Sequence, residues 1–293
     1  MRRWLQRPRL GSAVLAVAVA VTACVLAAPP AQAQDNEPAA RDPFVIVTAK
    51  VRPSVAAIGS YDRKDIPTVR YFGTGFVVGD GNFVATNHHV VEALRQTNRL
   101  AMLRVFFPDD SEVVGRPAKV LGEDRMHDVA VLRFDGPAVP ALGLRASERG
   151  YPPQGSAVGI IGYPIGLTLG LVPAVHGGKL AAVVPAVLPL PKGAKLNPDL
   201  IEAIKNPYKI YQLDIVAMPG NSGSPLFDAH SGLVLGIINK VLGSRTREHL
   251  IESPTGISYA VPSQWIEELL IRSLIEDQKN REPHDDRGQA TRR

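Results

Sequence analysis

Short apolar segments rich in Val, Ile and Phe recur along the chain between residues 45 and 262, separated by Gly, Pro, Asp or Asn. Segments of this length and composition are typical of β-strands. Because they follow one another at short intervals without long helical stretches, the pattern predicts an all-β fold built from antiparallel barrels. The segments predicted as strands are 75–78, 83–86, 102–107, 118–121, 129–134, 156–161, 210–215 and 233–239, and the stretch 45–58 before them is predicted as a short helix or strand.

The C-terminal part of the chain has a helical pattern instead. Ser263 is placed to cap a helix whose apolar residues recur at helical spacing. We therefore expect a closing helix over 263–276, packed against the second half of the fold. Residues 277–293 are charged, have no apolar face and are predicted to be a disordered tail. The apolar residues of the predicted helix are Ile266, Leu269, Leu270 and Leu274.

A link over 145–154, which contains Gly and Pro, divides the strands into a first barrel, about 45–145, and a second barrel, about 155–262. A chain of 293 residues can hold such a double barrel as one domain, 45–276. The segment 185–207 departs from the compact pattern, with four prolines between positions 185 and 198. It is predicted to be an inserted surface loop, and a substrate gate and a structural excursion are both open interpretations.

The N-terminal segment, 1–33, has the features of a secretory signal. An Arg-rich start precedes an apolar run over 11–28, and Ala-Gln-Ala at 31–33 forms a cleavage motif. The predicted mature chain begins with a flexible leader, 34–44, in the periplasm or outside the cell. An uncleaved membrane anchor stays open, because the run approaches the ~20 residues that span a bilayer. A lipoprotein in which Cys24 carries the lipid also stays open. Because Cys24 is the only cysteine, a soluble mature form has no disulfide.

The positive charge of the chain lies in this N-terminal segment. The formal charge is +5, from 33 basic and 28 acidic residues, but four of the arginines lie before the apolar run. Without the signal segment, 29 basic and 28 acidic residues remain, a net charge of +1. This balance argues against nucleic acid as a partner.

A serine lies among glycines and an asparagine in the run Gly220-Asn221-Ser222-Gly223. Glycine permits the positive φ angles of a tight turn and lets a substrate carbonyl approach the backbone. Ser222 can then be an exposed nucleophile, with the amides of Gly220 and Ser222 forming an oxyanion hole. The same residues also form ordinary turns, so the interpretation needs a base elsewhere in the chain.

Candidate bases and an orienting carboxylate lie upstream. His88 and His89 follow an apolar run, and Asp128 directly precedes another. Asp128 follows His89 by 39 residues and precedes Ser222 by 94, which gives the order His, Asp, Ser. This is one of several orders in which the Ser-His-Asp triad occurs. Adjacency alone leaves His88 as a rival base.

Four motifs in this order resemble those of the bacterial HtrA/Deg proteases, which are trypsin-like serine proteases. The resemblance covers about 45–270 and implies two six-stranded antiparallel barrels with a terminal helix. It also implies His89 as the base, because the family places its base directly before Val-Val, and it suggests a trimer. The tail is too short for the PDZ domain that usually follows in this family. The motifs are Gly-x-Gly-Phe at 73–76, Thr-Asn-x-His-Val-Val at 86–91, Asp-x-Ala-x-Leu at 128–132 and Gly-Asn-Ser-Gly at 220–223.

Two residues near the nucleophile depart from related families. Ser224 stands where HtrA proteins more often have glycine, and glutamyl endopeptidases share the run Gly-Asn-Ser-Gly-Ser-Pro, which leaves the subfamily open. Asn221 stands where animal trypsins have the aspartate that pairs with a new N-terminus during zymogen activation. Because asparagine cannot make that charge-assisted bond, activation by such a cut is not expected.

The resemblance also places the primary substrate pocket. Val216 lies six residues before the nucleophile, where trypsins carry an aspartate that binds Lys or Arg. Ile238 aligns with the histidine through which glutamyl endopeptidases bind Glu. A pocket with these two branched apolar walls is expected to accept Val, Ala, Ile or Leu and to reject charged residues.

We therefore expect a secreted serine endopeptidase with His89, Asp128 and Ser222 as its catalytic residues, acting on protein or peptide substrates, with a role in envelope protein quality control as one use. A catalytically silent binding or chaperone module with the same fold is the alternative. No cofactor is expected. His127 beside Asp128 resembles a metal pair but is interpreted as an exposed neighbour, and no metal site is expected. Membrane contact is expected only through an uncleaved N-terminal segment.

Overall fold

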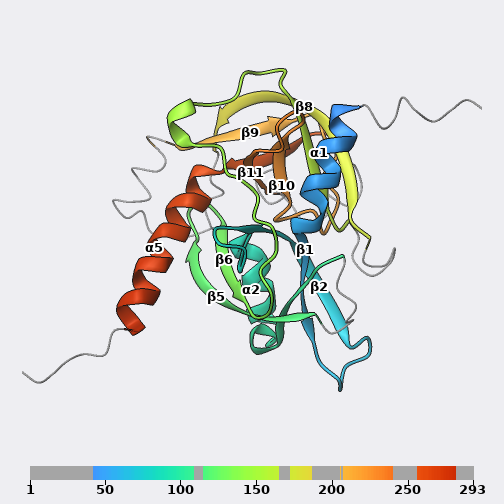
Figure 1. Ribbon diagram of the computed structural model, residues 1–293, viewed down its shortest axis with the longest axis vertical. Helices are drawn as coiled ribbons and strands as arrows, with labels where there is room; N and C mark the ends of the chain where they lie inside the picture. The colour runs from blue at the N-terminus through green and yellow to red at the C-terminus, as the bar shows by residue number, and fades with distance from the viewer. Residues whose placement is uncertain are drawn as a thin grey trace, which may run out of the picture. The chain divides into compact units, whose positions relative to one another are not determined.

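The computed structural model describes residues 42–108, 115–164, 172–186, 205, 207–239 and 256–281. These residues form two closed β-barrels of six antiparallel strands each, followed by a C-terminal helix (Figure 1). The architecture predicted from the sequence is thereby confirmed. Most of the predicted 185–207 insertion, the N-terminal signal and nearly all of the predicted leader lie outside the described residues.

The first barrel closes in the strand order β1-β2-β3-β6-β5-β4. Within it, β3 and β6 are antiparallel neighbours, with Thr86 opposite Ala130 at one end of the pair. Helix α2 (His88–Gln96) begins two residues after β3 ends. The strands are β1 (Val55–Tyr61), β2 (Val69–Val78), β3 (Phe83–Thr86), β4 (Leu103–Phe106), β5 (Arg116–Asp124) and β6 (Val129–Phe134).

The second barrel closes in the order β10-β11-β12-β9-β8-β7. The serine-containing turn connects β9 to β10 through residues 214–224. The link between the barrels runs beside this second barrel, where Leu144 forms a parallel bridge with Val234. The strands are β7 (Ala157–Gly162), β8 (Ala174–Pro185), β9 (Lys209–Leu213), β10 (Pro225–Asp228), β11 (Val234–Ile238) and β12 (Ser258–Pro262).

Some strands, such as β6 and β11, are buried on both faces, which explains why nearly all of their residues are apolar. On β6, Leu132 and Phe134 pack among residues of the first barrel and α2. Val129 and Val131, on the opposite face, belong to a core that also contains Phe227 and other residues of the second barrel. Successive side chains of a strand point to opposite faces. Full burial of such a side chain contributes about 1.5–3 kcal/mol, so both faces favour apolar residues.

Helix α1 (Pro43–Val51) begins the described chain and ends just before the 3-10 turn η2 (Arg52–Ser54). Its first turn is capped, because the Asp42 carboxylate accepts a hydrogen bond from the amide of Phe44 at 2.8 Å. Val47 and Val51 are buried in the core shared by the two barrels. The stretch 45–58, predicted as a helix or a strand, is therefore a helix followed by β1.

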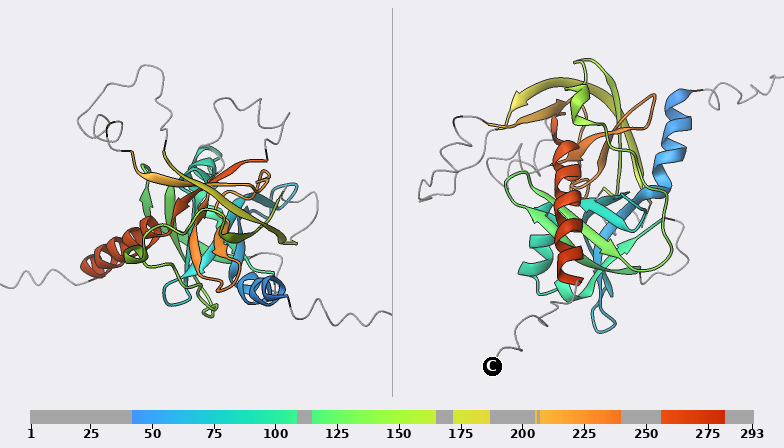
Figure 2. Two further views of the ribbon diagram at one scale, coloured as in Figure 1. Left: turned by 90° about the horizontal axis from the view of Figure 1, so that it is seen from above. Right: turned by 60° about the vertical axis from the view of Figure 1, so that its left-hand side comes forward.

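Helix α5 (Gln264–Arg281) lies against β5 and β6 of the first barrel (Figures 1 and 2). The expectation that the closing helix packs mainly on the second barrel is wrong. The helix also extends beyond residue 276, and Asp277 pairs there with Arg133 of β6 at 3.2 Å. No helix within the described ranges has both the length and the apolar character needed to cross a membrane.

Three strands of the second barrel, β8, β10 and β12, have no counterpart among the predicted segments. The sequence of β8 includes His176, Gly177 and Gly178, and β10 has four residues and begins with Pro225. Both segments are strands because each is paired on both sides. Strand β8 lies between β7 and β9, and β10 lies between β7 and β11. Strand formation depends on such partners more than on intrinsic preference.

Candidate active site

His89 and Asp128 lie at the same end of two paired strands. Because β3 and β6 are antiparallel neighbours, the residues that follow β3 lie beside those that precede β6. His89 lies at the start of α2 after β3, and Asp128 immediately precedes β6. The His89 ring nitrogen Nδ1 lies 2.6 Å from Asp128 Oδ2. The backbone amide of His89 donates to the other carboxylate oxygen at 2.8 Å. These two bonds fix the ring on the carboxylate and leave Nε2 available to accept a proton.

The Asp128 carboxylate is also held by an asparagine from the second barrel. Asn239, directly after β11, donates from its side-chain amide to Asp128 Oδ2 at 2.8 Å. The side chain of Asn87 donates to the Asp128 backbone carbonyl at 3.0 Å. Asp128 itself has φ of 53°, a left-handed conformation that Asp tolerates better than most residues. The sequence interpretation assigned no role to Asn239, whose only signal is a polar residue at the end of an apolar strand.

His88 has a different partner from His89. Its Nδ1 lies 2.9 Å from Glu123 Oε1, near the end of β5. Arg95 of α2 donates to the same carboxylate, at 3.2 Å for the bond to Oε1. His88 is therefore part of an ion-pair network that joins α2 to β5, and its ring is directed to Glu123.

His127 is buried, contrary to the expectation of an exposed neighbour. It is 8% exposed, its ring stacks on Trp265 with centroids 3.6 Å apart, and Tyr208 meets it edge-on at 4.6 Å. Its Nδ1 lies 2.8 Å from Asp124 Oδ2. Burial of Asp124 opposes ionisation, but hydrogen bonds from the side chain and amide of His127 hold the pKa of this carboxyl below its usual range. His127 thus ties the turn before Asp128 to α5.

Tyr208 lies close to the carboxylates of Asp124 and Asp128. Burial, together with the negative charges of Asp128 and Asp124, raises the pKa of its phenol. The phenol therefore stays neutral at physiological pH. The cluster beside Asp128 consists of His127 with its partner Asp124 and the two aromatic rings of Trp265 and Tyr208.

Ser222 follows a tight turn of residues 218–221. The amide of Asn221 donates to the carbonyl of Met218 at 3.0 Å, and Gly220 has φ of 99°. A glycine with positive φ after Pro219 is characteristic of a type II turn. No described residue accepts a hydrogen bond from the amides of Gly220 or Ser222. Both amides are therefore available to a ligand.

The backbone of Ser222 lies against the first barrel beside α2. The amide of Thr74 on β2 donates to the Ser222 carbonyl at 2.8 Å. A Cβ placed on Gly73 would lie 3.0 Å from the same carbonyl and 2.7 Å from Val90. A side chain at position 73 would therefore crowd both Val90 and the Ser222 carbonyl, which favours glycine at this position. Within the described residues no hydrogen bond joins the Ser222 hydroxyl to His89, and such bonds often form fully only when substrate binds.

The two residues assigned to the substrate pocket differ in accessibility. Val216 lies between β9 and the turn that precedes Ser222, and is 40% exposed. Ile238, at the end of β11, is fully buried in the core of the second barrel. The Val216 side chain is therefore accessible from solvent, whereas the Ile238 side chain is not.

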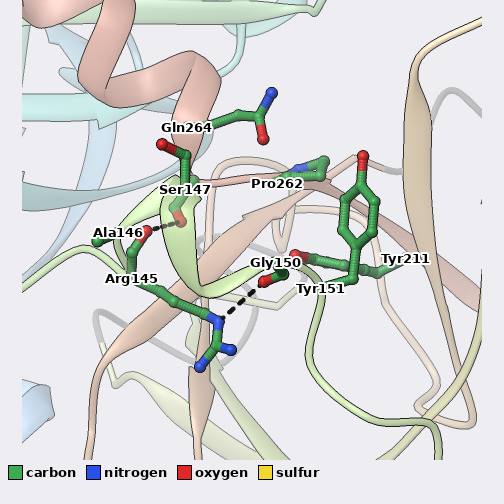
Figure 3. Close-up of a pocket in the computed structure, with 9 residues that line it drawn as sticks. Arg145, Ala146, Ser147, Gly150, Tyr151, Tyr211, Pro262 and Gln264 are labelled. Atoms are coloured by element: carbon green, nitrogen blue, oxygen red, sulfur yellow. Dashed lines mark hydrogen bonds between the residues drawn. The ribbon is translucent and has the colours of Figure 1, made fainter.

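A cavity of about 180 Å³ lies away from these residues, between the inter-barrel link and the start of α5 (Figure 3). The Arg145 side chain donates to the carbonyl of Gly150 at 3.3 Å rather than projecting freely into the cavity. Burial raises the pKa of Tyr211 to about 12. The cavity contains no candidate catalytic residue. Its lining is Arg145, Ala146, Ser147, Gly150, Tyr151, Tyr211, Pro262, Ser263 and Gln264.

Residues 73–237 match the family model described as Trypsin-like peptidase domain. A Halomonas elongata protein named Probable periplasmic serine endoprotease DegP-like is 31% identical over 193 residues, which are 66% of this chain and 33% of the relative. Putative serine protease HhoB of Synechocystis is 28% identical over 196 residues, 66% of this chain and 38% of the relative. The chain thus spans about a third of the length of these curated relatives.

Solved structures show the same fold. The structure titled HtrA-type protease AlgW with tripeptide superposes with a TM-score of 0.55 at 23% identity, covering 80% of this chain and 64% of that chain. The resemblance to HtrA/Deg proteases, inferred from four short motifs, is confirmed by these relatives.

Proposed function

Because the chain belongs to the trypsin-like peptidase family, we propose that it is a serine endopeptidase whose triad is Ser222, His89 and Asp128. The observation that carries the proposal is the His89–Asp128 pair, with Nδ1 and Oδ2 2.6 Å apart. It is supported by the attachment of the Ser222 backbone to β2, next to α2. The first contact joins His89 to Asp128, and the second holds the Ser222 backbone on the strand that precedes β3 and α2.

In the proposed mechanism, the Ser222 hydroxyl attacks the scissile carbonyl and His89 Nε2 takes its proton. Asp128, as a carboxylate, keeps the Nδ1 proton of His89 in place and stabilises the imidazolium that forms. His89 then gives the proton to the leaving amine, and water releases the acyl group by the same steps. His89 is assigned as the base rather than His88 because the motif of the HtrA/Deg proteases places the base directly before Val-Val, and because the His89 side chain is more exposed, 30% against 13% for His88.

The negative charge that develops on the carbonyl oxygen requires donors. The amides of Gly220 and Ser222 have no acceptor among the described residues; Gly220 lies within the turn 218–221, with positive φ, and Ser222 directly follows it. We assign them to the oxyanion hole. Removal of one such donor typically lowers kcat by about 10²–10³.

Specificity for small or medium aliphatic residues before the cut is part of the proposal. Val216 offers an exposed, uncharged surface near the nucleophile turn, which would leave the charge of a bound Lys, Arg or Glu unpaired. One methylene changes binding by only about 1–3 kcal/mol in an apolar pocket, so selection among Val, Ala, Ile and Leu should be modest.

Cleavage of a peptide library by the purified mature chain tests both the activity and this preference. The expected profile has aliphatic residues at the cleaved position and strong rejection of charged ones. A dominant Arg, Lys or Glu would contradict the assignment of Val216 to the pocket. If the folded protein cleaves nothing and reacts with no serine reagent, the catalytically silent module is the better description.

Export to the cell envelope is also proposed. Curated relatives are named periplasmic endoproteases, and residues 1–33 have the pattern of a signal segment. The mature protein is expected to begin near Gln34, as mass spectrometry of its N-terminus from the native host will show. A lipidated Cys24, or an intact Met1 in the membrane fraction, would contradict a soluble exported form.

A further inference from the structure

We infer that Thr74 is a positioning residue for the oxyanion hole, holding through its side-chain hydroxyl the turn that carries Gly220 and Ser222. The inference rests on the proposed function and extends it to a residue outside the triad. Thr74 lies on β2 of the first barrel and is fully buried. Burial of a hydroxyl costs free energy unless the hydroxyl is hydrogen-bonded, so the hydrogen-bond partners of Thr74 indicate the role of its side chain.

All three polar groups of Thr74 are used, and they join separate parts of the chain. Its hydroxyl donates to the Gly220 carbonyl at 2.7 Å and accepts from the amide of Tyr163 at 3.1 Å. Its amide donates to the Ser222 carbonyl at 2.8 Å. Its carbonyl accepts from the hydroxyl of Thr86 at 2.7 Å. Thr74 therefore connects two strands of the first barrel to the end of β7 and to the nucleophile turn.

The two carbonyls that Thr74 binds belong to the two residues whose amides are assigned to the oxyanion hole. A residue's amide and carbonyl are separated by only its φ and ψ angles. The carbonyl of Gly220 is held by Thr74, and the amide that follows it is held by the bond from Asn221 to Met218. These bonds restrict the conformations open to Gly220, which otherwise has unusual backbone freedom.

Removal of the hydroxyl alone should release this restraint. Valine has nearly the shape of threonine, so Thr74→Val keeps the packing but leaves the Gly220 carbonyl and the Tyr163 amide without their partner. Interactions made only with the developing oxyanion affect kcat and not KM. Since both donors stay in the chain, the loss should be smaller than the deletion of one, about 10- to 100-fold in kcat.

The experiment measures kcat and KM of the mature protein with a peptide selected from the library, for wild type, Thr74→Val, Thr74→Ala and Thr74→Ser. Affinity for a peptide boronate, whose tetrahedral adduct places an oxygen in the hole, is measured beside it. The matched control is Ser54→Ala, because Ser54 is also buried and donates its hydroxyl to a backbone carbonyl, that of Pro140, at 2.6 Å. Thermal unfolding of each variant separates loss of the site from loss of the fold.

We expect Thr74→Val and Thr74→Ala to lose kcat and boronate affinity by similar factors at nearly unchanged KM. Thr74→Ser should retain most activity, and Ser54→Ala should lose stability without this change in kcat. A Thr74→Val variant with wild-type kcat, or one that changes KM alone, overturns the inference while leaving the endopeptidase function intact. If Thr74→Val does not fold, Thr74→Ala decides by the same criteria. A folded wild type that neither cleaves nor binds the boronate overturns the proposed function itself.

Discussion

Replacing Ser222 with alanine is expected to abolish covalent labelling by an organophosphonate, and to lower peptide hydrolysis by about 10⁴-fold or more. Without the hydroxyl, no acyl-enzyme can form. His89→Ala should cause a loss of similar size, because this variant has no imidazole on Asp128 to accept the proton of the Ser222 hydroxyl. Labelling is measured by mass spectrometry of the intact protein and hydrolysis by initial rates on a cleaved library peptide.

His88→Ala is the matched control for the histidine variant. Its imidazole pairs with Glu123, so its removal should weaken the contact between α2 and β5 and leave most of the labelling. Both histidine variants lose one imidazole and its bond to a carboxylate from the first turn of the same helix, so a loss of labelling in His89→Ala alone indicates a catalytic role for His89. Equal loss of labelling in the two would show that the base is wrongly assigned.

Asp128→Asn is expected to lower kcat by about 10⁴-fold, the factor known for the corresponding change in the chymotrypsin-type triad. The carboxylate accepts from the His89 ring, the His89 amide and the Asn239 side chain. An asparagine can accept through only one side-chain atom and donates through the other. The ring of His89 would then turn or adopt the wrong tautomer, with Nε2 no longer available as a base.

Asp124→Asn is the control for this change. Asp124 lies four residues before Asp128 and also binds a histidine ring, that of His127, at 2.8 Å. Its replacement should reduce stability and change kcat by less than about tenfold, because it touches neither Ser222 nor His89. Rates are compared at several pH values at which both variants are folded. If the two variants lose the same factor in kcat, Asp128 has no special role.

The two acidic residues at the end of β5 have related structural roles. Glu123 holds His88, which precedes the candidate base, and Asp124 holds His127, which precedes the candidate orienting carboxylate. The segment that carries His89 and the segment that carries Asp128 are thus each bound to β5 through the histidine that precedes the candidate catalytic residue. Trp265 of α5 adds a stacking contact on the ring of His127.

Predictions from sequence succeeded where the signal is local. The segments 83–86 and 129–134 coincide with β3 and β6, because their apolar runs end abruptly at polar residues. The short runs around His89, Asp128 and Ser222 were recognisable for the same reason. In contrast, β8 and β10 lack such runs, and their strand conformation depends on pairing with neighbours distant in the sequence.

The amino-acid sequence by itself determined the fold class, the family and the order of the candidate triad, since these are written in consecutive residues whose turn and strand preferences are local. Tertiary structure decided the partners. It assigned Glu123 to His88, placed Asn239 on Asp128, put Thr74 under the nucleophile turn and laid α5 against the first barrel. The reason is physical: each of these contacts joins segments more than 30 residues apart, and only closure and packing of the two barrels bring those segments together.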